Sequence, residues 1–183
     1  MSPVCRSPSL RQALSAYLLR HPEASEVVDG FRELLDDRDD PFLRERLAGH
    51  FTGSAWLVSA DGERVLLPHH RKLDRWLQPG GHADGDTDLA RVALTEATEE
   101  SGLTGLQVDP VIFDLDRHWI PDRGDVPGHW HHDVRFVVRA GDDERFVVSE
   151  ESHALAWRAV GEVAADETMD DSLRRMARRW LAR

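Results

Sequence analysis

The chain has 183 residues, and its 34 Asp and Glu against 23 Lys and Arg give a formal net charge of −11. This acidic balance excludes a protein that holds duplex nucleic acid on a broad basic face, although a bound metal ion could still recruit a small anionic ligand. The single cysteine, Cys5, excludes a disulfide framework and a cysteine-based zinc site, and the lack of a signal peptide or long apolar run predicts a cytoplasmic protein that does not enter membranes.

Two helices are predicted near the N-terminus. Leu10, Leu14 and Leu18 recur at helical spacing, and Pro22 should end the helix that they define. A second apolar stripe predicts a helix over residues 23–35. We expect these stripes to pack either against the core of the protein or against a second copy in a homodimer.

The spacing of the apolar residues changes after these N-terminal helices. A short third helix is predicted over residues 41–47, because proline favours the first helical position. Residues 51–59 and 64–67 are instead typical of strands, and the Asp61-Gly62 pair between them indicates a hairpin turn. Residues 1–49 should therefore form a helical N-terminal extension, and residues 50–183 the main domain.

The rest of the chain alternates between strands and helices. A helix over residues 88–101 should end at Ser101-Gly102, because glycine favours the left-handed conformation that ends many helices. The remaining predicted elements are strands at 107–117, 133–139 and 155–160, a loop at 120–130 and a helix at 168–182. This order indicates an α/β or α+β domain with a mixed sheet around one central helix.

Three glutamates of the 88–101 helix stand out from its pattern. On a helical wheel at about 100° per residue, Glu96 and Glu100 fall within the apolar stripe that the first two turns should bury. Ionised carboxylates are costly to bury without partners, so these two should be paired or bound to a cation. Glu99 lies beside them at the i, i+3 spacing, and a divalent ion that prefers oxygen would relieve the repulsion among the three. The alternative is a solvated acidic face.

The same helix carries a pattern that resembles the box of the Nudix hydrolases, G-x5-E-x7-R-E-U-x-E-E-x-G-U, where U is a bulky aliphatic residue. Aligned from its first glycine, the chain offers Gly81, Thr87, Thr95, Glu96, Ala97, Glu99, Glu100, Gly102 and Leu103. The order of strand, turn, strand and Pro-Gly-Gly entry before the box is also similar, and the resemblance covers roughly residues 50–165.

Two positions depart from the family pattern. Thr95 stands where the family has an arginine that orients a catalytic glutamate, and Thr87 stands where it has the first glutamate. Asp86 is the neighbouring carboxylate that could take over that second role. We also expect Asp86 or Thr87 to cap the helix, with Asp88 favourable in its first turn.

The resemblance implies an α/β/α sandwich and hydrolysis of a diphosphate linked to another group, as in nucleoside diphosphate derivatives, with Mg²⁺ or Mn²⁺ as cofactor. By position, Glu96, Glu99 and Glu100 would be the catalytic metal ligands, joined by the backbone carbonyl of Gly80. The general base varies within the family. Glu96 could serve, as could a later carboxylate, Glu150 or Glu151, although these two could equally be surface acids without a role in catalysis.

Two further segments could hold the substrate. The basic stretch with Arg71, Lys72 and Arg75 could bind its phosphates, or could be a solvated loop. His131 lies where family members bind the rest of the substrate. A zinc site within residues 129–132 is not expected, because the adjacent His131 and His132 should point to opposite sides of a strand.

Three alternatives to the enzyme remain open at this stage. The two threonines would suit a Nudix-fold binding or regulatory module that has lost catalysis. An isoprenoid diphosphate isomerase shares the fold but needs a core cysteine, which Cys5 does not supply. An acidic scaffold protein would make no use of the glutamates. The substrate stays open as well, although a lone Tyr17 disfavours dinucleoside polyphosphates, whose hydrolases carry a tyrosine after the box.

Overall fold

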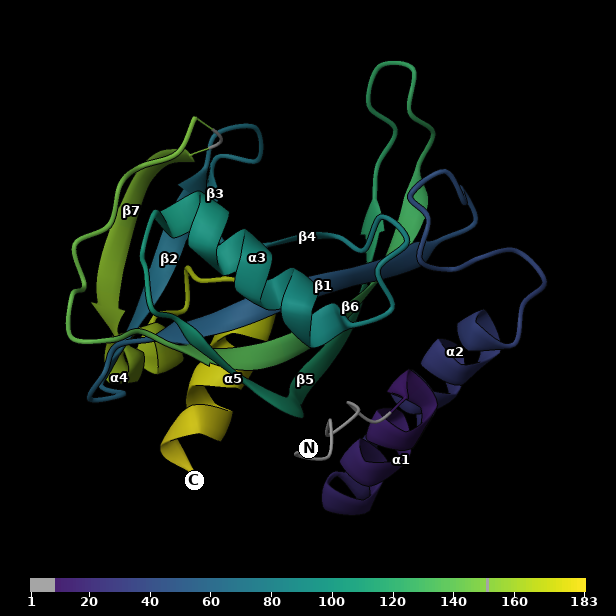
Figure 1. The fold of residues 1–183 in the computed structure, drawn as a ribbon, viewed down its shortest axis with the longest axis horizontal. Coiled ribbons are helices and arrows are strands. Elements are labelled where there is room, and N and C mark those ends of the chain that lie inside the picture. Colours follow the sequence, from purple (N-terminus) through teal and green to yellow (C-terminus); the bar gives the residue numbers. More distant parts are fainter. Residues whose placement is uncertain (1–8, 151) are drawn as a thin grey trace, which may run out of the picture.

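A seven-stranded mixed sheet organises residues 9–150 and 152–183, the part of the chain that the computed structural model describes (Figure 1). The elements in chain order are α1 (Leu10–Arg20), a 3₁₀ turn (Pro22–Ala24), α2 (Ser25–Leu35), β1 (His50–Val58), β2 (Arg64–His70), β3 (Arg75–Trp76), β4 (Gly80–His82), α3 (Leu89–Ser101), β5 (Gln107–Ile120), β6 (His129–Arg139), β7 (Ser152–Ala159), α4 (Val160–Ala165) and α5 (Asp171–Leu181).

The strands lie in the order β3-β2-β1-β6-β5, with β4 added to the free part of β1 and β7 added to β2. The β1–β6 pair is parallel and runs in register from His50 opposite His131 to Val58 opposite Arg139. The other pairs are antiparallel. β1 is therefore the central strand, and all nine of its residues are buried.

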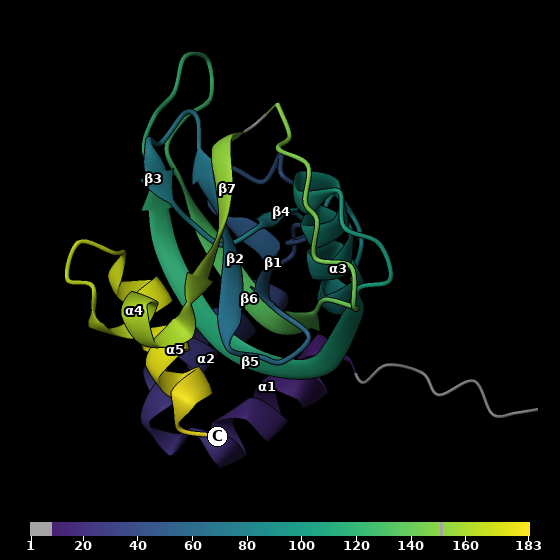
Figure 2. The same cartoon turned by 90° about the vertical axis from the view of Figure 1, so that its left-hand side faces the viewer.

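Helices cover both faces of the sheet, so that the alternating side chains of β1 enter two cores. Ala55 and Leu57 pack in the core that includes α3, whereas Trp56 and Val58 pack in the core that includes α4 and α5. Figure 2 shows α3 and the α4–α5 pair on opposite sides of the curved sheet. The expected α/β/α sandwich with a mixed sheet is confirmed.

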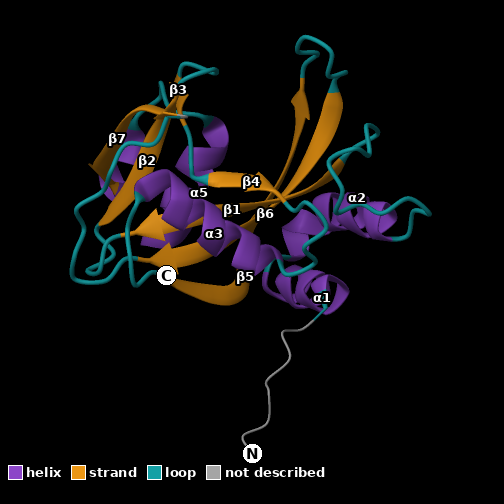
Figure 3. Cartoon of the chain, turned by 45° about the horizontal axis from the view of Figure 1, so that its top comes forward, coloured by secondary structure: helices purple, strands orange, loops and turns teal. Residues whose placement is uncertain are grey.

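The N-terminal helices pack onto this domain. Leu14, Tyr17 and Phe31 are buried in the same core as Phe51 of β1. The Arg20 guanidinium adds a hydrogen bond of 3.0 Å to the carbonyl of Ile112 in β5. Figure 3 shows α1 and α2 side by side at one end of the molecule. Of the two expected uses of their apolar stripes, packing against the core is the one observed.

The prediction of a third helix over residues 41–47 is wrong. This segment forms successive tight turns, with backbone hydrogen bonds of 3.4 Å from Leu43 to Asp40 and 3.1 Å from Arg46 to Leu43. A seven-residue helix is too short to be stable by itself. The backbone N–H of Phe51 instead holds the carbonyl of Pro41 at 2.8 Å, which draws the segment toward β1. The short α4, β3 and β4 have no counterpart among the predicted elements.

A buried ionic network ties α5 to the sheet. The strand expected at 133–139 is observed as part of β6, and its polar side chains Asp133 and Arg135 are buried. The Arg135 guanidinium, 2% exposed, donates to Asp133 at 2.7 Å and pairs with Asp114 and Asp116 of β5. Arg175 of α5 reaches both of these β5 carboxylates, and Arg179 of α5 reaches Asp114. Both signs of charge are therefore compensated within the core.

Within the described ranges, no helix combines the length and the apolar content that crossing a bilayer requires.

Candidate active site

The central helix α3 begins one residue later than expected and is capped by a different side chain. Asp88 is the N-cap, and its carboxylate accepts the N–H of Arg91 at 3.2 Å. The prediction that Asp86 or Thr87 caps the helix is wrong, because Asp86 instead forms a two-pronged ion pair with the Arg91 guanidinium at 2.6 and 2.7 Å. The predicted stop is confirmed, with Gly102 in the left-handed conformation at φ 67°.

Glu96 and Glu100 of α3 face the short strand β4. The backbone N–H of Gly80 donates to Glu100 Oε1 at 2.8 Å. Glu96 lies so close to Gly81 that a Cβ added there would be 2.3 Å from Glu96 Oε1. Both glutamates are half-buried, whereas Glu99 is exposed. The helix and the Gly-Gly strand thus hold two carboxylates together at the edge of the core.

Gly81→Ala tests this close approach. The added Cβ must displace the Glu96 carboxylate, and misplacing a catalytic group by about 1 Å can cost about 10²-fold in rate. We expect kcat/KM to fall by about that factor while the protein stays folded, because the obstacle is the flexible end of one side chain. Gly161→Ala is the matched control, since a Cβ there meets nothing within 4 Å. Equal kcat/KM values for the two variants would contradict the proximity.

The two threonines of the box are exposed, and neither replaces the charged group that the family has there. Thr95 and Thr87 both face solvent. Arg44, from another segment of the chain, supplies a positive charge that interacts with Glu96. Its guanidinium forms an ion pair with Asp84. The hydrogen bond to Asp84 is the main cause that raises the pKa of Arg44, and the charge of Glu96 adds to it. Arg44 belongs to the turns before β1, so the box sequence alone does not reveal it.

The basic residues lie around the hairpin between β2 and β3. Arg71 and Lys72 are exposed at its tip, and Arg71 Nη2 donates to the carbonyl of Ser152 at 3.3 Å. Arg75 pairs with Asp170 at 3.7 Å. Only residues 77–79 separate β3 from β4, so this hairpin is tethered closely to Gly80.

Two of the residues proposed as general base are the later carboxylates Glu150 and Glu151. Glu150 is exposed in the loop before β7. Glu151 lies outside the described residues.

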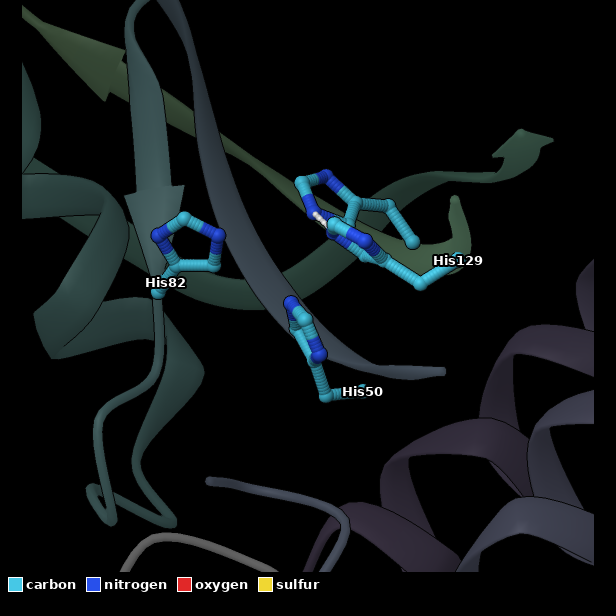
Figure 4. Close-up of side chains that lie close together, drawn as sticks. His50, His82 and His129 are labelled. Atoms are coloured by element: carbon cyan, nitrogen blue, oxygen red, sulfur yellow. Dashed lines mark hydrogen bonds between the residues drawn. The ribbon is translucent and has the colours of Figure 1, made fainter. Parts of the chain in front are cut away.

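A cluster of four histidines flanks the other end of β4. The side chains of His50, His82, His129 and His131 bring one ring nitrogen each to within 4.8 Å of one another (Figure 4). Burial is the main cause that lowers the pKa of His82 to about 4 and of His131 to about 2. His132 points to the opposite side and packs edge-on against Phe31, as its alternation with His131 predicts. The sequence had indicated His131 alone; His50 and His82 were missed because they belong to other strands.

The α/β/α sandwich with its mixed sheet matches the fold of solved Nudix hydrolases. The family model of the NUDIX domain matches residues 50–180, which is more than half of the chain. The chain therefore belongs to the NUDIX family. This membership and the similar solved structures support an enzyme of the pyrophosphohydrolase type.

Solved structures share this fold at low identity. A NUDIX-family hydrolase from Clostridium perfringens is 22% identical with a TM-score of 0.57, over 73% of this chain and 97% of its own. A MutT protein from Methanosarcina mazei Go1 is 19% identical with a TM-score of 0.57, over 75% and 96%. A C. elegans Ap4A hydrolase is 14% identical with a TM-score of 0.55, over 72% and 95%. The search of curated proteins returned no match.

Proposed function

We propose that the protein is a metal-dependent hydrolase that cleaves a diphosphate linkage in a nucleoside diphosphate derivative or a similar small phosphorylated metabolite. The observation that carries the proposal is the placement of Glu96 and Glu100 against Gly80 and Gly81. The family assignment supports hydrolysis of an acid anhydride. The fold neighbours include a hydrolase named for Ap4A, which is consistent with a nucleotide substrate.

The chemistry of the carboxylates suits Mg²⁺ or Mn²⁺. These ions prefer oxygen ligands. Glu96 supplies one carboxylate, Glu99 and Glu100 supply two more about one helical turn later, and the Gly80 carbonyl is a further oxygen. A bound ion of this kind neutralises the diphosphate and activates the attacking water. The two glycines position the carboxylates that would hold the ion. The Gly80 N–H donates to Glu100, and the lack of a side chain at Gly81 leaves room for Glu96.

The proton of the attacking water needs an acceptor. We propose that Glu96, or one of the later carboxylates Glu150 and Glu151, takes this role. Glu150 is exposed, so water can reach its carboxylate.

The phosphates of the substrate need cations in a chain whose net charge is −11. Arg71 and Lys72 are exposed at the β2–β3 hairpin and Arg75 follows them, so we assign phosphate binding to these three residues. Arginine suits this role because its guanidinium donates two parallel hydrogen bonds to phosphate oxygens. His131, the remaining residue expected to contact substrate, lies in the histidine cluster beside β4.

A second candidate function is a ligand-binding or regulatory module. The observation that favours it is the exposure of Thr95 and Thr87, which leaves the glutamates without the arginine and the first glutamate that the family box supplies. Groups of this kind around metal ligands typically contribute 10- to 100-fold, roughly, to affinity or activity.

An activity assay separates the two functions. The purified chain is incubated with nucleoside triphosphates, nucleotide sugars and non-nucleotide diphosphates, each with Mg²⁺, with Mn²⁺ and with excess EDTA. The enzyme is expected to release phosphorylated products from at least one substrate class with either ion and to lose that activity with EDTA. Tight binding of a diphosphate without hydrolysis under any of these conditions would favour the regulatory module.

We also propose that residues 1–49 are an extension added to a catalytic domain of residues 50–183. The family match begins at residue 50, which supports this division. The described part of the extension shares the core of the domain, so it should stabilise the fold rather than move independently. A homodimer is the further assembly that we propose to test, by measuring the mass of the chain in solution.

A further inference from the structure

The four clustered histidines come from three neighbouring strands. His50 begins β1, His82 ends β4, and His129 and His131 lie two residues apart in β6. His50 is 1% exposed and His129 6% exposed, so the centre of the cluster is shielded from bulk water. Figure 4 shows the rings of His50, His82 and His129 turned toward a common centre.

The sheet register explains why these rings meet. His50 lies directly opposite His131 in the parallel β1–β6 pair, and His82 lies opposite Thr52, two residues beyond His50, in the β1–β4 pair. His129 and His131 point to the same face because side chains of a strand alternate with a period of two. The ring centroids of His50 lie 4.9 Å from those of His129 and His131 and 5.1 Å from that of His82.

Backbone carbonyls orient two of the rings. His50 Nδ1 lies 3.2 Å from the carbonyl of Arg46, and His129 Nδ1 lies 2.8 Å from the carbonyl of Pro127. A carbonyl only accepts hydrogen bonds, so each Nδ1 carries the proton and each Nε2 presents a lone pair. This is the arrangement that fixes the tautomer of histidines that bind metal ions.

One of the lone pairs that result has no protein donor among the described residues. His50 Nε2 is buried and has no hydrogen-bond partner among the described residues. His129 Nε2 lies 3.1 Å from His131 Nε2, and with its own proton on Nδ1 it can accept the Nε2–H of His131 or bind a metal ion in its place. Buried polar atoms without partners are rare in folded proteins, and a cation shared by the four rings would satisfy His50 Nε2 and replace the hydrogen bond between His129 and His131.

We propose that His50, His82, His129 and His131 form a binding site for one Zn²⁺ ion, separate from the glutamates of α3. A zinc ion with four nitrogen ligands at about 2.0–2.1 Å holds those nitrogens about 3.4 Å apart at the corners of a tetrahedron. The observed spacings, 3.1 Å for one pair and at most 4.8 Å for the others, need only small side-chain rotations to reach this geometry. Imidazole suits zinc, whereas Mg²⁺ and Mn²⁺ prefer oxygen.

The site would also steady β4. His82 directly follows Gly80 and Gly81, the residues that contact Glu100 and Glu96. A zinc ion on His82 would cross-link the end of β4 to β1 and β6. Binding of zinc itself does not depend on the proposed hydrolase activity.

Metal titration of the intact chain tests this site without an activity assay. The chain is stripped of metals with a chelator and titrated with Co²⁺, whose visible absorption reports tetrahedral coordination, and then with Zn²⁺ in competition. We expect one equivalent to bind, and His50→Ala and His131→Ala each to weaken zinc binding by about 100-fold or more, beyond the effect of losing an outer-shell group. His153→Ala, at an exposed histidine, is the matched control and should bind zinc as the unmodified chain does.

Two further measurements keep the outcome clear. X-ray absorption on the unmodified zinc-loaded chain should show a shell of histidine nitrogens at about 2.0–2.1 Å, which requires no variant to fold. The doubly substituted chain with Glu96→Gln and Glu100→Gln should still bind zinc, even if it has no hydrolase activity. A shell dominated by oxygen, no tetrahedral Co²⁺ spectrum, or equal zinc affinity in His50→Ala and His153→Ala would overturn the proposal.

Discussion

Glu100→Gln is expected to lower kcat/KM for diphosphate hydrolysis at least ~10²-fold, the scale of losing one well-placed electrostatic group. Glutamine has the same shape as glutamate, and its side-chain oxygen can still accept the Gly80 N–H that Glu100 accepts at 2.8 Å. What the substitution removes is the negative charge that binds the divalent ion. The loss should therefore appear in the rate and in the Mg²⁺ concentration needed for half-maximal rate, with no loss of folded protein.

Glu162→Gln provides the control for Glu100→Gln. Glu162 is exposed in the first turn of α4, so its substitution changes the net charge by the same amount at a distant site. The rate should stay at the unmodified value. If both variants kept full activity, the glutamates of α3 would not bind the catalytic ion, and an acidic scaffold role would be favoured.

Arg135→Met is expected to have the largest effect on stability, a loss of about 3–5 kcal/mol in the free energy of unfolding. The guanidinium is 2% exposed and pairs with Asp133, Asp114 and Asp116. Methionine keeps the aliphatic bulk but leaves Asp133 without its strongest partner in the core. Urea unfolding followed by tryptophan fluorescence measures the change directly.

The same network predicts how the stability of the fold changes at low pH. Burial alone would raise the pKa of Asp116, but the hydrogen bond with His118 and the charges of Arg135 and Arg175 outweigh it and lower that pKa. A carboxyl group with a lowered pKa adds stability above its unfolded pKa and loses it as the pH falls. The difference in stability between the Arg135→Met variant and the unmodified chain should thus shrink in acid.

Arg145→Met is the matched control for Arg135→Met. Arg145 forms an ion pair with Asp143 on the surface, where its side chain is 89% exposed. Exposed pairs contribute little because water already solvates both charges. The urea midpoint should therefore stay close to that of the unmodified chain. Equal midpoints for the two variants would show that the buried network does not stabilise the fold.

The sequence predicted the helices that bury one face. The stripes of α1, α2 and α3 are confirmed, because burying one face of a helix leaves its period in the sequence, and the strands β1, β5 and β6 are confirmed as elements. The 41–47 segment was predicted wrongly because a favourable first proline cannot replace tertiary contacts. Strand β6 was predicted, but nothing local reveals that its Arg135 is buried beside Asp114 of β5, which arginines of α5 also reach.

The residues of the candidate site also differ in whether the sequence alone could reveal them. Glu96 and Glu100 could be found from the sequence because both lie on one helix, whose geometry is known without the fold. The histidine cluster could not, because it depends on the register of three strand segments that are far apart in the sequence. His131 was noticed, but its partner residues His50 and His82 carry no shared local pattern. Arg44 near Glu96 was missed for the same reason.

The position of the catalytic ion is the most direct test of the proposed function. Crystals of the full chain grown with Mn²⁺ and a non-hydrolysable diphosphate analogue would show the ion by its anomalous scattering. We predict a Mn²⁺ peak bridging Glu96 and Glu100, with the diphosphate between this ion and the Arg71–Arg75 hairpin. A diphosphate bound elsewhere, or Mn²⁺ absent from these glutamates while the ligand is present, would contradict the assignment of α3 as the metal-binding helix.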